Sequence, residues 1–223
     1  MSRKHGVLSL AATLVVLLVA GCATTQPGPT EWDGLVRQPN TRLDAVFLRP
    51  DAEIPTYTSI FLAPAEVQFA RNWDPNRGGR SLSRRLDTAD IVAIKDNLAT
   101  MFGDIFREEL TAGGYQVVTE PGPDTLLVVP AIVDLYITAP DNMTPGSNRT
   151  YTANSGRMTL VLELRDSVTG ETLARVVDGQ SGRTSGVMTV TNRVTNTADA
   201  RRIIRIWARA LRSGLDSLYK GGA

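Results

Sequence analysis

The sequence predicts an α+β fold, a two-layer domain in which two helices pack on one face of a mixed, mostly antiparallel sheet. The first observation is the order of patterns: one strand, one helical stripe, several alternating strands and a second helical stripe. The second is that short turns join the later strands, which favours antiparallel neighbours. The third is the opening strand–helix–strand unit, which favours a parallel crossover.

Residues 1–21 have the order of a secretory signal: the basic pair Arg3-Lys4, an apolar run, then small residues before Cys22. The apolar run is shorter than the roughly 20 residues that a membrane-spanning helix needs. Val19-Ala20-Gly21-Cys22 resembles the lipobox of bacterial lipoproteins. That resemblance implies cleavage before Cys22 and acylation of its sulfur. An ordinary signal peptide with a chance cysteine is the alternative.

The composition limits the kinds of binding, catalytic and metal sites that the chain can form. The chain has 24 Lys and Arg residues against 23 Asp and Glu residues, and loss of residues 1–21 removes only Arg3 and Lys4. A nearly neutral chain does not suggest nucleic-acid binding. The single histidine, His5, lies in the expected signal, and Cys22 is the single cysteine. Histidine and cysteine catalysis, zinc sites built from these residues and disulfides are therefore not expected. We expect no cofactor and no metal.

The segments after the signal differ in character. Residues 22–31 are short and polar and predict a flexible tether. Residues 32–56 show no clear hydrophobic period, so we expect an irregular lead-in that drapes over the domain. Residues 57–220 are expected to form a single α+β periplasmic domain. It opens with a strand at 58–63, followed by a long polar connection at 66–85 that carries five arginines.

A helix is predicted next. Asp87 or Thr88 is its expected N-cap, and Gly113-Gly114 its end. Its apolar residues recur at helical spacing on one stripe: Ile91, Ile94, Leu98, Met101, Phe102, Ile105 and Phe106. A strand at 115–120 and a Pro/Gly turn at 121–124 follow.

Residues 125–138 form the most apolar stretch and predict a central strand. The face with Leu127 and Val129 stays apolar along its length, whereas the opposite face, with Asp134, becomes more polar. Pro130 cannot donate to a neighbouring strand, so we expect a bulge or an unpaired edge there.

Two later strands, 158–165 and 172–178, are predicted to form a hairpin about the turn at 166–170. Setting Glu163 opposite Arg175 places apolar pairs on one face and an ion pair on the other. Residues 140–149 and 179–186 are expected to be loops, and 187–191 a last short strand.

The final helix is expected to begin after a cap at Asn196 or Thr197 and to run to about Tyr219. One broad face is apolar. The other carries an arc of arginines, Arg201, Arg202, Arg205, Arg209 and Arg212, with no acid inside it. An arginine-rich solvated face is one interpretation. The other is docking of an anionic envelope partner, since guanidinium groups suit carboxylates and phosphates. Arg201, Arg205, Arg209 and Arg212 are the candidate partner-binding residues.

Several short segments, in order, resemble one family of bacterial lipoproteins, the domain of unknown function 3313. They are Leu48-Arg49-Pro50 with Tyr57 and residues 60–64; residues 102–110 with 113–118; residues 122–126; residues 164–167 with 169–171; and residues 174–178. The resemblance covers about Trp32 to Tyr219. It implies an envelope lipoprotein and transfers no catalytic residue.

Two carboxylates allow a competing enzyme hypothesis. Asp134 lies within an apolar strand, and with Glu163 it could serve a carboxylate-dependent cell-wall (peptidoglycan) hydrolase. Nothing in their spacing singles them out, and an Asp134 paired with an arginine is the simpler alternative. Asp141, Asn142 and Asn148 lack the spacing of a calcium loop. Gly78-Gly79 lacks the spacing of a phosphate loop.

These observations favour a non-enzymatic binding or scaffolding module, held at the membrane by acyl chains on Cys22. Because Ala23 rather than Asp follows the cysteine, the lipobox resemblance implies the periplasmic face of the bacterial outer membrane. The expected partner is anionic: an acidic protein face, phospholipid, lipopolysaccharide or cell wall.

Overall fold

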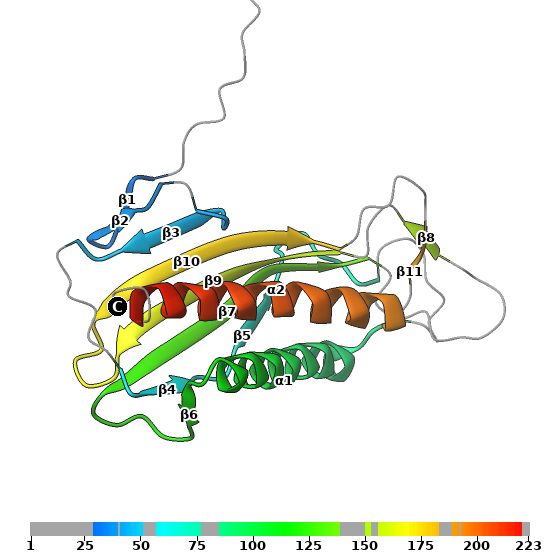
Figure 1. The fold of residues 1–223 in the computed structure, drawn as a ribbon. Helices are drawn as coiled ribbons and strands as arrows, with labels where there is room; N and C mark the ends of the chain where they lie inside the picture. Colours follow the sequence, from blue (N-terminus) through cyan, green and yellow to red (C-terminus); the bar gives the residue numbers. More distant parts are fainter. Residues whose placement is uncertain are drawn as a thin grey trace, which may run out of the picture.

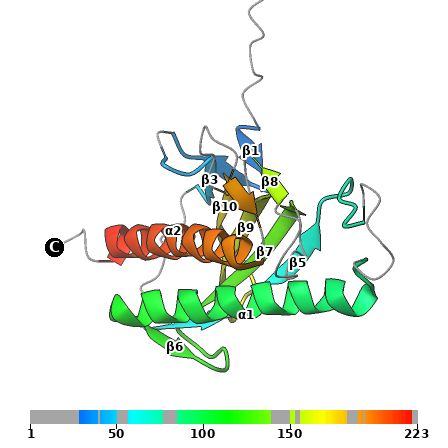
Figure 2. The ribbon, with the colours of Figure 1, turned by 90° about the vertical axis from the view of Figure 1, so that its right-hand side faces the viewer.

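The computed structural model describes residues 29–39, 41–50, 57–76, 85–138, 150–152, 156–182, 189–191 and 193–219. Its main sheet has nine strands, β1(Glu31–Trp32), β2(Leu35–Arg37), β3(Ala45–Leu48), β4(Ser59–Leu62), β5(Glu66–Phe69), β6(Gln116–Val118), β7(Thr125–Ile137), β9(Gly156–Asp166) and β10(Thr172–Ser181). Two helices, α1(Thr88–Ala112) and α2(Arg193–Tyr219), lie side by side on one face (Figures 1 and 2). The predicted α+β class and layering are confirmed.

The strand order is β1-β2-β3-β10-β9-β7-β4-β6, with β5 also paired to β7. β4 runs parallel to both β6 and β7, so the chain crosses from β4 over α1 to a parallel strand, as predicted. The next three neighbouring pairs, β7–β9, β9–β10 and β10–β3, are each antiparallel. A separate small sheet joins β8(Thr150–Thr152) to β11(Thr189–Thr191), the last short strand that the sequence predicts.

The central hairpin has the predicted register. Glu163 lies opposite Arg175, and Leu164 and Leu162 lie opposite Ala174 and Val176. The leucines of β9 face the helices and are buried, while Glu163 and Arg175 lie on the other face of the sheet. The strand of Arg175 continues to Ser181, so the loop expected at 179–186 begins later than predicted.

The segment 32–56, expected to be irregular, contains strands instead. β1 and β2 form a hairpin whose turn is Asp33-Gly34, with φ of 51° and 75°. β3 then pairs with β10 and extends the main sheet. Phe47 and Leu35 are almost fully buried. The strands are too short to show a period, so their pairing partner, and not their own pattern, determines their structure.

β5 corrects a second expectation, because its four residues lie within the connection 66–85 that was predicted to be a loop. It pairs with β7 beyond the end of β4. Pro130 lies opposite the break between the two. Val128 accepts a hydrogen bond from the Ala63 N–H at 2.9 Å, and alternate residues direct their backbone to the same side. The nitrogen of Pro130 therefore faces the interruption, as expected of a residue that cannot donate.

The bulge in β7 is at Val133–Tyr136, not at Pro130. Asp134 occupies it with φ of 51°, a conformation that aspartate tolerates better than most residues. Before the bulge, Leu126, Val128 and Ile132 form the core face, which is opposite to the face expected. After it, Leu135 points into the core. The extra residue exchanges the two faces, and a period-two pattern cannot anticipate this.

Each helix is held by identifiable contacts. Asp87 is the N-cap of α1, one of the two residues predicted, and it forms a reciprocal capping box with Asp90. Gly113 and Gly114 follow the end of the helix, as predicted. α2 begins at Arg193, earlier than the predicted cap. The Asn196 side chain instead donates to the Thr138 carbonyl at 3.5 Å, which ties the helix to the end of β7.

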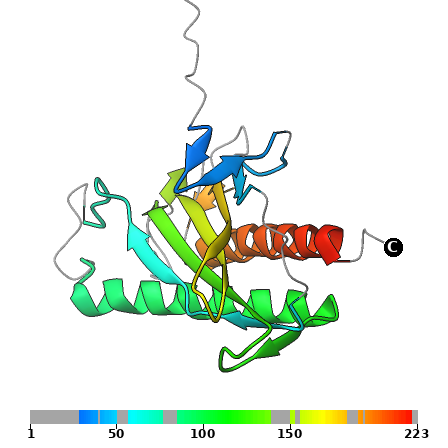
Figure 3. The ribbon, with the colours of Figure 1, turned by 90° about the vertical axis from the view of Figure 1, so that its left-hand side faces the viewer.

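The core lies between the helices and the sheet. Phe102, Phe106 and Leu110 of α1 and Ile204, Trp207 and Leu215 of α2 are almost fully buried against it. Figure 3 shows the β1–β2 hairpin, in blue, on the side of the molecule away from α1, the long green helix. None of the described helices has an apolar stretch suited to crossing a bilayer.

Candidate functional site

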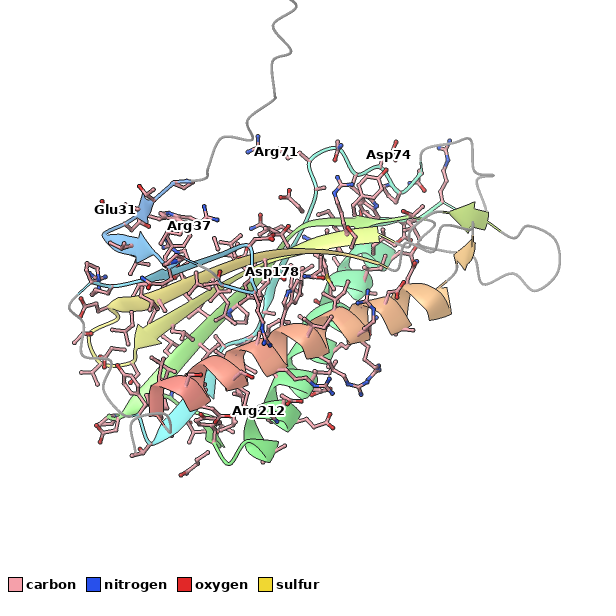
Figure 4. All side chains as sticks on the ribbon, turned by 45° about the horizontal axis from the view of Figure 1, so that its top comes forward. Glu31, Arg37, Arg71, Asp74, Asp178 and Arg212 are labelled. Atoms are coloured by element: carbon pink, nitrogen blue, oxygen red, sulfur yellow. The ribbon has the colours of Figure 1, made fainter. Side chains whose placement is uncertain are left out.

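The arginine arc lies on the outer side of α2, and the apolar face of the helix positions it. Ile203, Ile204 and Trp207 are buried against the sheet, so residues on the opposite side of the helix face outward. Arg201, Arg205 and Arg209 are exposed, and Arg212, labelled in Figure 4, is half-buried. Ile206 is 39% exposed beside them.

Part of the arc is neutralised, which corrects the expectation that no acid lies inside it. Glu109 of α1 approaches Arg212 at 2.6 Å and Arg209 at 3.8 Å. Arg202 lies 3.8 Å from Asp199. Sequence reasoning missed Glu109 because it belongs to the other helix. Among the described residues, Arg201 and Arg205 form no ion pair.

Asp178 fixes the height of α2 above the sheet. This β10 residue, labelled in Figure 4, is 2% exposed, and its carboxylate accepts a hydrogen bond from the Trp207 indole at 2.8 Å. The Asp44 N–H and the Gln180 amide donate to the same carboxylate at 3.1 and 2.8 Å. Three N–H donors offset the cost of burying a carboxylate without a cation. The interaction joins α2, β10 and the start of β3.

A second ion cluster lies on the other face of the sheet. Arg175, 7% exposed, contacts Glu163 at 2.6 Å and Asp33 at 2.8 Å, and its guanidinium lies 4.1 Å from the Trp32 ring centre. Arg165 pairs with the same Glu163. Burial opposes ionisation, yet hydrogen bonds and charge from Arg165 and Arg175 hold the pKa of Glu163 below its usual range. This cluster clamps the β1–β2 hairpin to β10.

The two carboxylates of the hydrolase hypothesis do not form a pair. Glu163 lies opposite Val129, and Asp134 follows Val129 by five positions on β7. At about 3.3 Å per residue they are separated by roughly 16 Å, beyond the 5–10 Å that glycosidases use. Asp134 is also exposed, and it pairs with no arginine among the described residues. Neither environment is that of a glycosidase acid.

A pocket of about 560 Å³ opens between the first halves of α1 and α2, above the bulged end of β7. Ile94, Leu98 and Met101 of α1 line it together with Leu135, Met158 and Ile203. Arg201 and Arg157 are also among its lining residues. Of the candidate arginines, only Arg201 borders this pocket.

Other sequence candidates fall outside the described residues: Cys22, Arg77, Arg80, Arg84, Asp141, Asn142 and Asn148. Arg71 and Arg85, which belong to the connection 66–85, are described and exposed. Within the described parts of the chain, no three metal-binding side chains gather into a cluster.

The fold defines a class of protein, an α+β domain with two helices on one face of a mixed sheet. The family model described as "Protein of unknown function (DUF3313)" matches residues 29–211. The chain therefore belongs to the DUF3313 family, which confirms the resemblance stated from the sequence. No curated protein matches the chain.

Several solved structures resemble the chain path. The PelC dodecamer from Paraburkholderia phytofirmans is 11% identical with a TM-score of 0.38, over 75% of this chain and 96% of that one. A minor lipoprotein from Acinetobacter baumannii is 12% identical with a TM-score of 0.34, over 73% and 95%. Protein XCC0632 from Xanthomonas campestris is 12% identical with a TM-score of 0.40, over 76% and 93%. These likenesses do not extend to function.

Proposed function

We propose that the protein is a lipid-anchored envelope lipoprotein that binds an anionic partner and performs no chemistry. Its anchor is Cys22, acylated at the periplasmic face of the outer membrane. The lipobox pattern supports the anchor, and membership of a family whose description names no activity is compatible with a binding role.

We infer the binding surface from one observation about the arginines of α2. Arg201 and Arg205 are exposed, and they have no carboxylate partner among the described residues. Arg209 continues the same side of the helix and is 65% exposed despite its contact with Glu109. An exposed guanidinium keeps its planar donor fork free for a carboxylate or phosphate of a partner. Arg212 belongs to the helix–helix contact and is a weaker candidate.

The test is crosslinking of the acylated protein in intact cells, with the captured species identified by mass. The double variant Arg205→Gln, Arg209→Gln removes two charges and leaves the buried face of α2 unchanged. We expect crosslinks to fall at least fivefold, and the remaining binding to lose its dependence on salt.

A matched control separates this effect from loss of net charge. Arg42 and Arg71 are exposed and belong to other parts of the chain, and Arg42→Gln, Arg71→Gln removes the same two charges. The control should keep wild-type crosslinks. If the α2 double variant crosslinks like wild type, the arginine arc is only a solvated helix face. Clearing of purified cell wall in a zymogram would point to the hydrolase hypothesis instead.

A further inference from the structure

The pocket between the helices exists because the packing side chains become smaller toward the start of each helix. Phe102 and Phe106 stack at 3.9 Å in the second half of α1 and are fully buried. More than two turns before Phe102, Ile94 is only half-buried, and Ala93 and Ala200 line the space from α1 and α2. No aromatic side chain of α1 is available there, so the space above Leu98, Leu135 and Met158 is not filled by the helices.

Among the described residues, the arginines and carboxylates that line the pocket do not pair with one another. Asp104 lies 3.3 Å from Arg107 and Asp199 lies 3.8 Å from Arg202, whereas Asp90 accepts a hydrogen bond from the neutral Asp87 N–H and keeps its charge. The two lining arginines differ. Within the described chain, Arg157 lies over the Tyr136 ring and Arg201 is exposed, and neither forms an ion pair. The site therefore offers an anionic ligand a cation that the fold does not use.

We propose that this pocket binds a single-chain anionic amphiphile, a fatty acid or a lysophospholipid. The hydrocarbon chain lies on the floor of Ile94, Leu98, Met101, Leu135 and Met158, and the acidic headgroup lies beside Arg201. A volume of about 560 Å³ is within the range of small-ligand sites. Burial of the chain supplies the affinity, and the guanidinium fork selects the anionic head.

This site is distinct from partner docking on the outer face of α2. Arg205 does not line the pocket, whereas Arg201 does. Arg205 and Arg209 do not line the pocket and therefore test docking alone, whereas Ala93 lines it and tests the pocket alone. If Arg205→Gln, Arg209→Gln keeps wild-type crosslinks while Ala93→Trp loses amphiphile labelling, docking is refuted and the pocket is retained. The opposite pattern refutes the pocket and retains docking.

The experiment uses the full acylated protein in nanodiscs. Two photoreactive probes are added separately, a 16-carbon fatty acid and a lysophosphatidylglycerol of equal chain length, each with a diazirine on the chain. After irradiation, labelled peptides are mapped by mass spectrometry. We expect saturable labelling of residues 88–104 and 196–203, competed by the unlabelled amphiphile. The probe that half-saturates at the lower concentration identifies the ligand source.

Matched variants test the site. Ala93→Trp fills the pocket mouth, and Ala89→Trp places the same side chain on an exposed residue of α1 that does not line the pocket. The first should reduce labelling at least fivefold and the second should not. Arg201→Gln should raise the half-saturating concentration at least threefold, and Arg205→Gln should leave it unchanged.

Circular dichroism melting confirms that each variant is folded, and a neutral fatty alcohol probe of the same length tests the headgroup. Equal labelling of Ala93→Trp and Ala89→Trp, or label spread evenly over the chain, would overturn the pocket as a binding site. Labelling by the alcohol that equals that of the acid, and that ignores Arg201→Gln, would refute an anionic ligand.

Discussion

Single residues carry much of the specificity of this fold, and Asp178 is the clearest case. Its carboxylate is buried without a cation and accepts from Trp207, Asp44 and Gln180. An isolated buried carboxylate would be costly, but hydrogen bonds to a charged acceptor are about twice as strong as neutral ones. This residue therefore determines where α2 lies on the sheet, and with it the direction in which the arginines point.

Asp178→Ala should destabilise the protein by about 2–4 kcal/mol, because it leaves the buried Trp207 indole N–H without an acceptor and also removes the acceptor of the Asp44 N–H. Urea unfolding measures the change. Trp207→Phe removes only the indole donor, and in the Asp178→Ala background it should cost much less than in wild type. Equal costs of Trp207→Phe in both backgrounds would show that the two side chains are not coupled.

Glu163 makes the free energy of unfolding depend on pH in the acidic range. The native state favours its ionised form, because the pKa of this carboxyl is held below its usual range by Arg165 and Arg175 despite burial. A lowered folded-state pKa contributes stability that is present above the unfolded pKa, about 4.3, and is lost as pH falls through the folded value.

Glu163→Gln should therefore lower the urea midpoint clearly at pH 7 and much less at pH 3. Asp166 remains as a second source of acid sensitivity, because hydrogen bonds from Thr169 and Tyr57 lower the pKa of its carboxyl. A difference between wild type and Glu163→Gln that stays constant from pH 7 to pH 3 would contradict this assignment.

At the scale of elements, the bulged end of β7 and the start of β9 determine the shape of the pocket floor. Gly156 begins β9 with φ of 152°, and a Cβ there would lie 2.3 Å from the Tyr136 carbonyl oxygen. The backbone of both strands would have to move to accommodate any other residue. Gly156 also lines the pocket, so strand geometry and ligand site are linked at this position.

Gly156→Ala should cost about 2–4 kcal/mol of stability and weaken amphiphile labelling of the pocket.

Gly214 provides the opposite case. It lies exposed within α2, and a Cβ there meets no atom within 4 Å. Gly214→Ala should stabilise the protein by about 0.5–1 kcal/mol through helix propensity. Thermal melting of both variants checks the pair, and a Gly156→Ala variant as stable as wild type would mean that β9 starts differently.

At the scale of the whole molecule, our proposal assigns membrane attachment to acyl chains on Cys22. Stable membrane attachment takes two acyl chains, at about 0.8 kcal/mol per buried CH₂ group. None of the described helices offers a membrane-crossing segment in their place.

Cys22→Ser should therefore release the protein into the soluble fraction or leave it unprocessed. Fractionation of cells followed by mass determination of the N-terminal peptide distinguishes these outcomes. The conservative Ala23→Ser variant should remain bound. Membrane association of Cys22→Ser equal to that of wild type would contradict acylation at this residue.

The sequence by itself determined the class of fold, the parallel crossover around α1, and the register of the β9–β10 hairpin. These follow from local periodicity and turn length, and a one-residue slip would place Arg175 on the buried face of Leu162 and Leu164. The family also follows from short segments in order.

Only the tertiary structure decided the pairing of β1–β3, the exchange of faces in β7 at Asp134, and the contacts of Glu109 with Arg209 and Arg212. A strand of four residues takes its partner from distant chain, and a bulge reverses a period-two pattern with one added residue. An ion pair between two helices depends on the angle at which they pack. These features, and the pocket between the first halves of α1 and α2, arise from contacts between residues far apart in sequence, which local patterns do not encode.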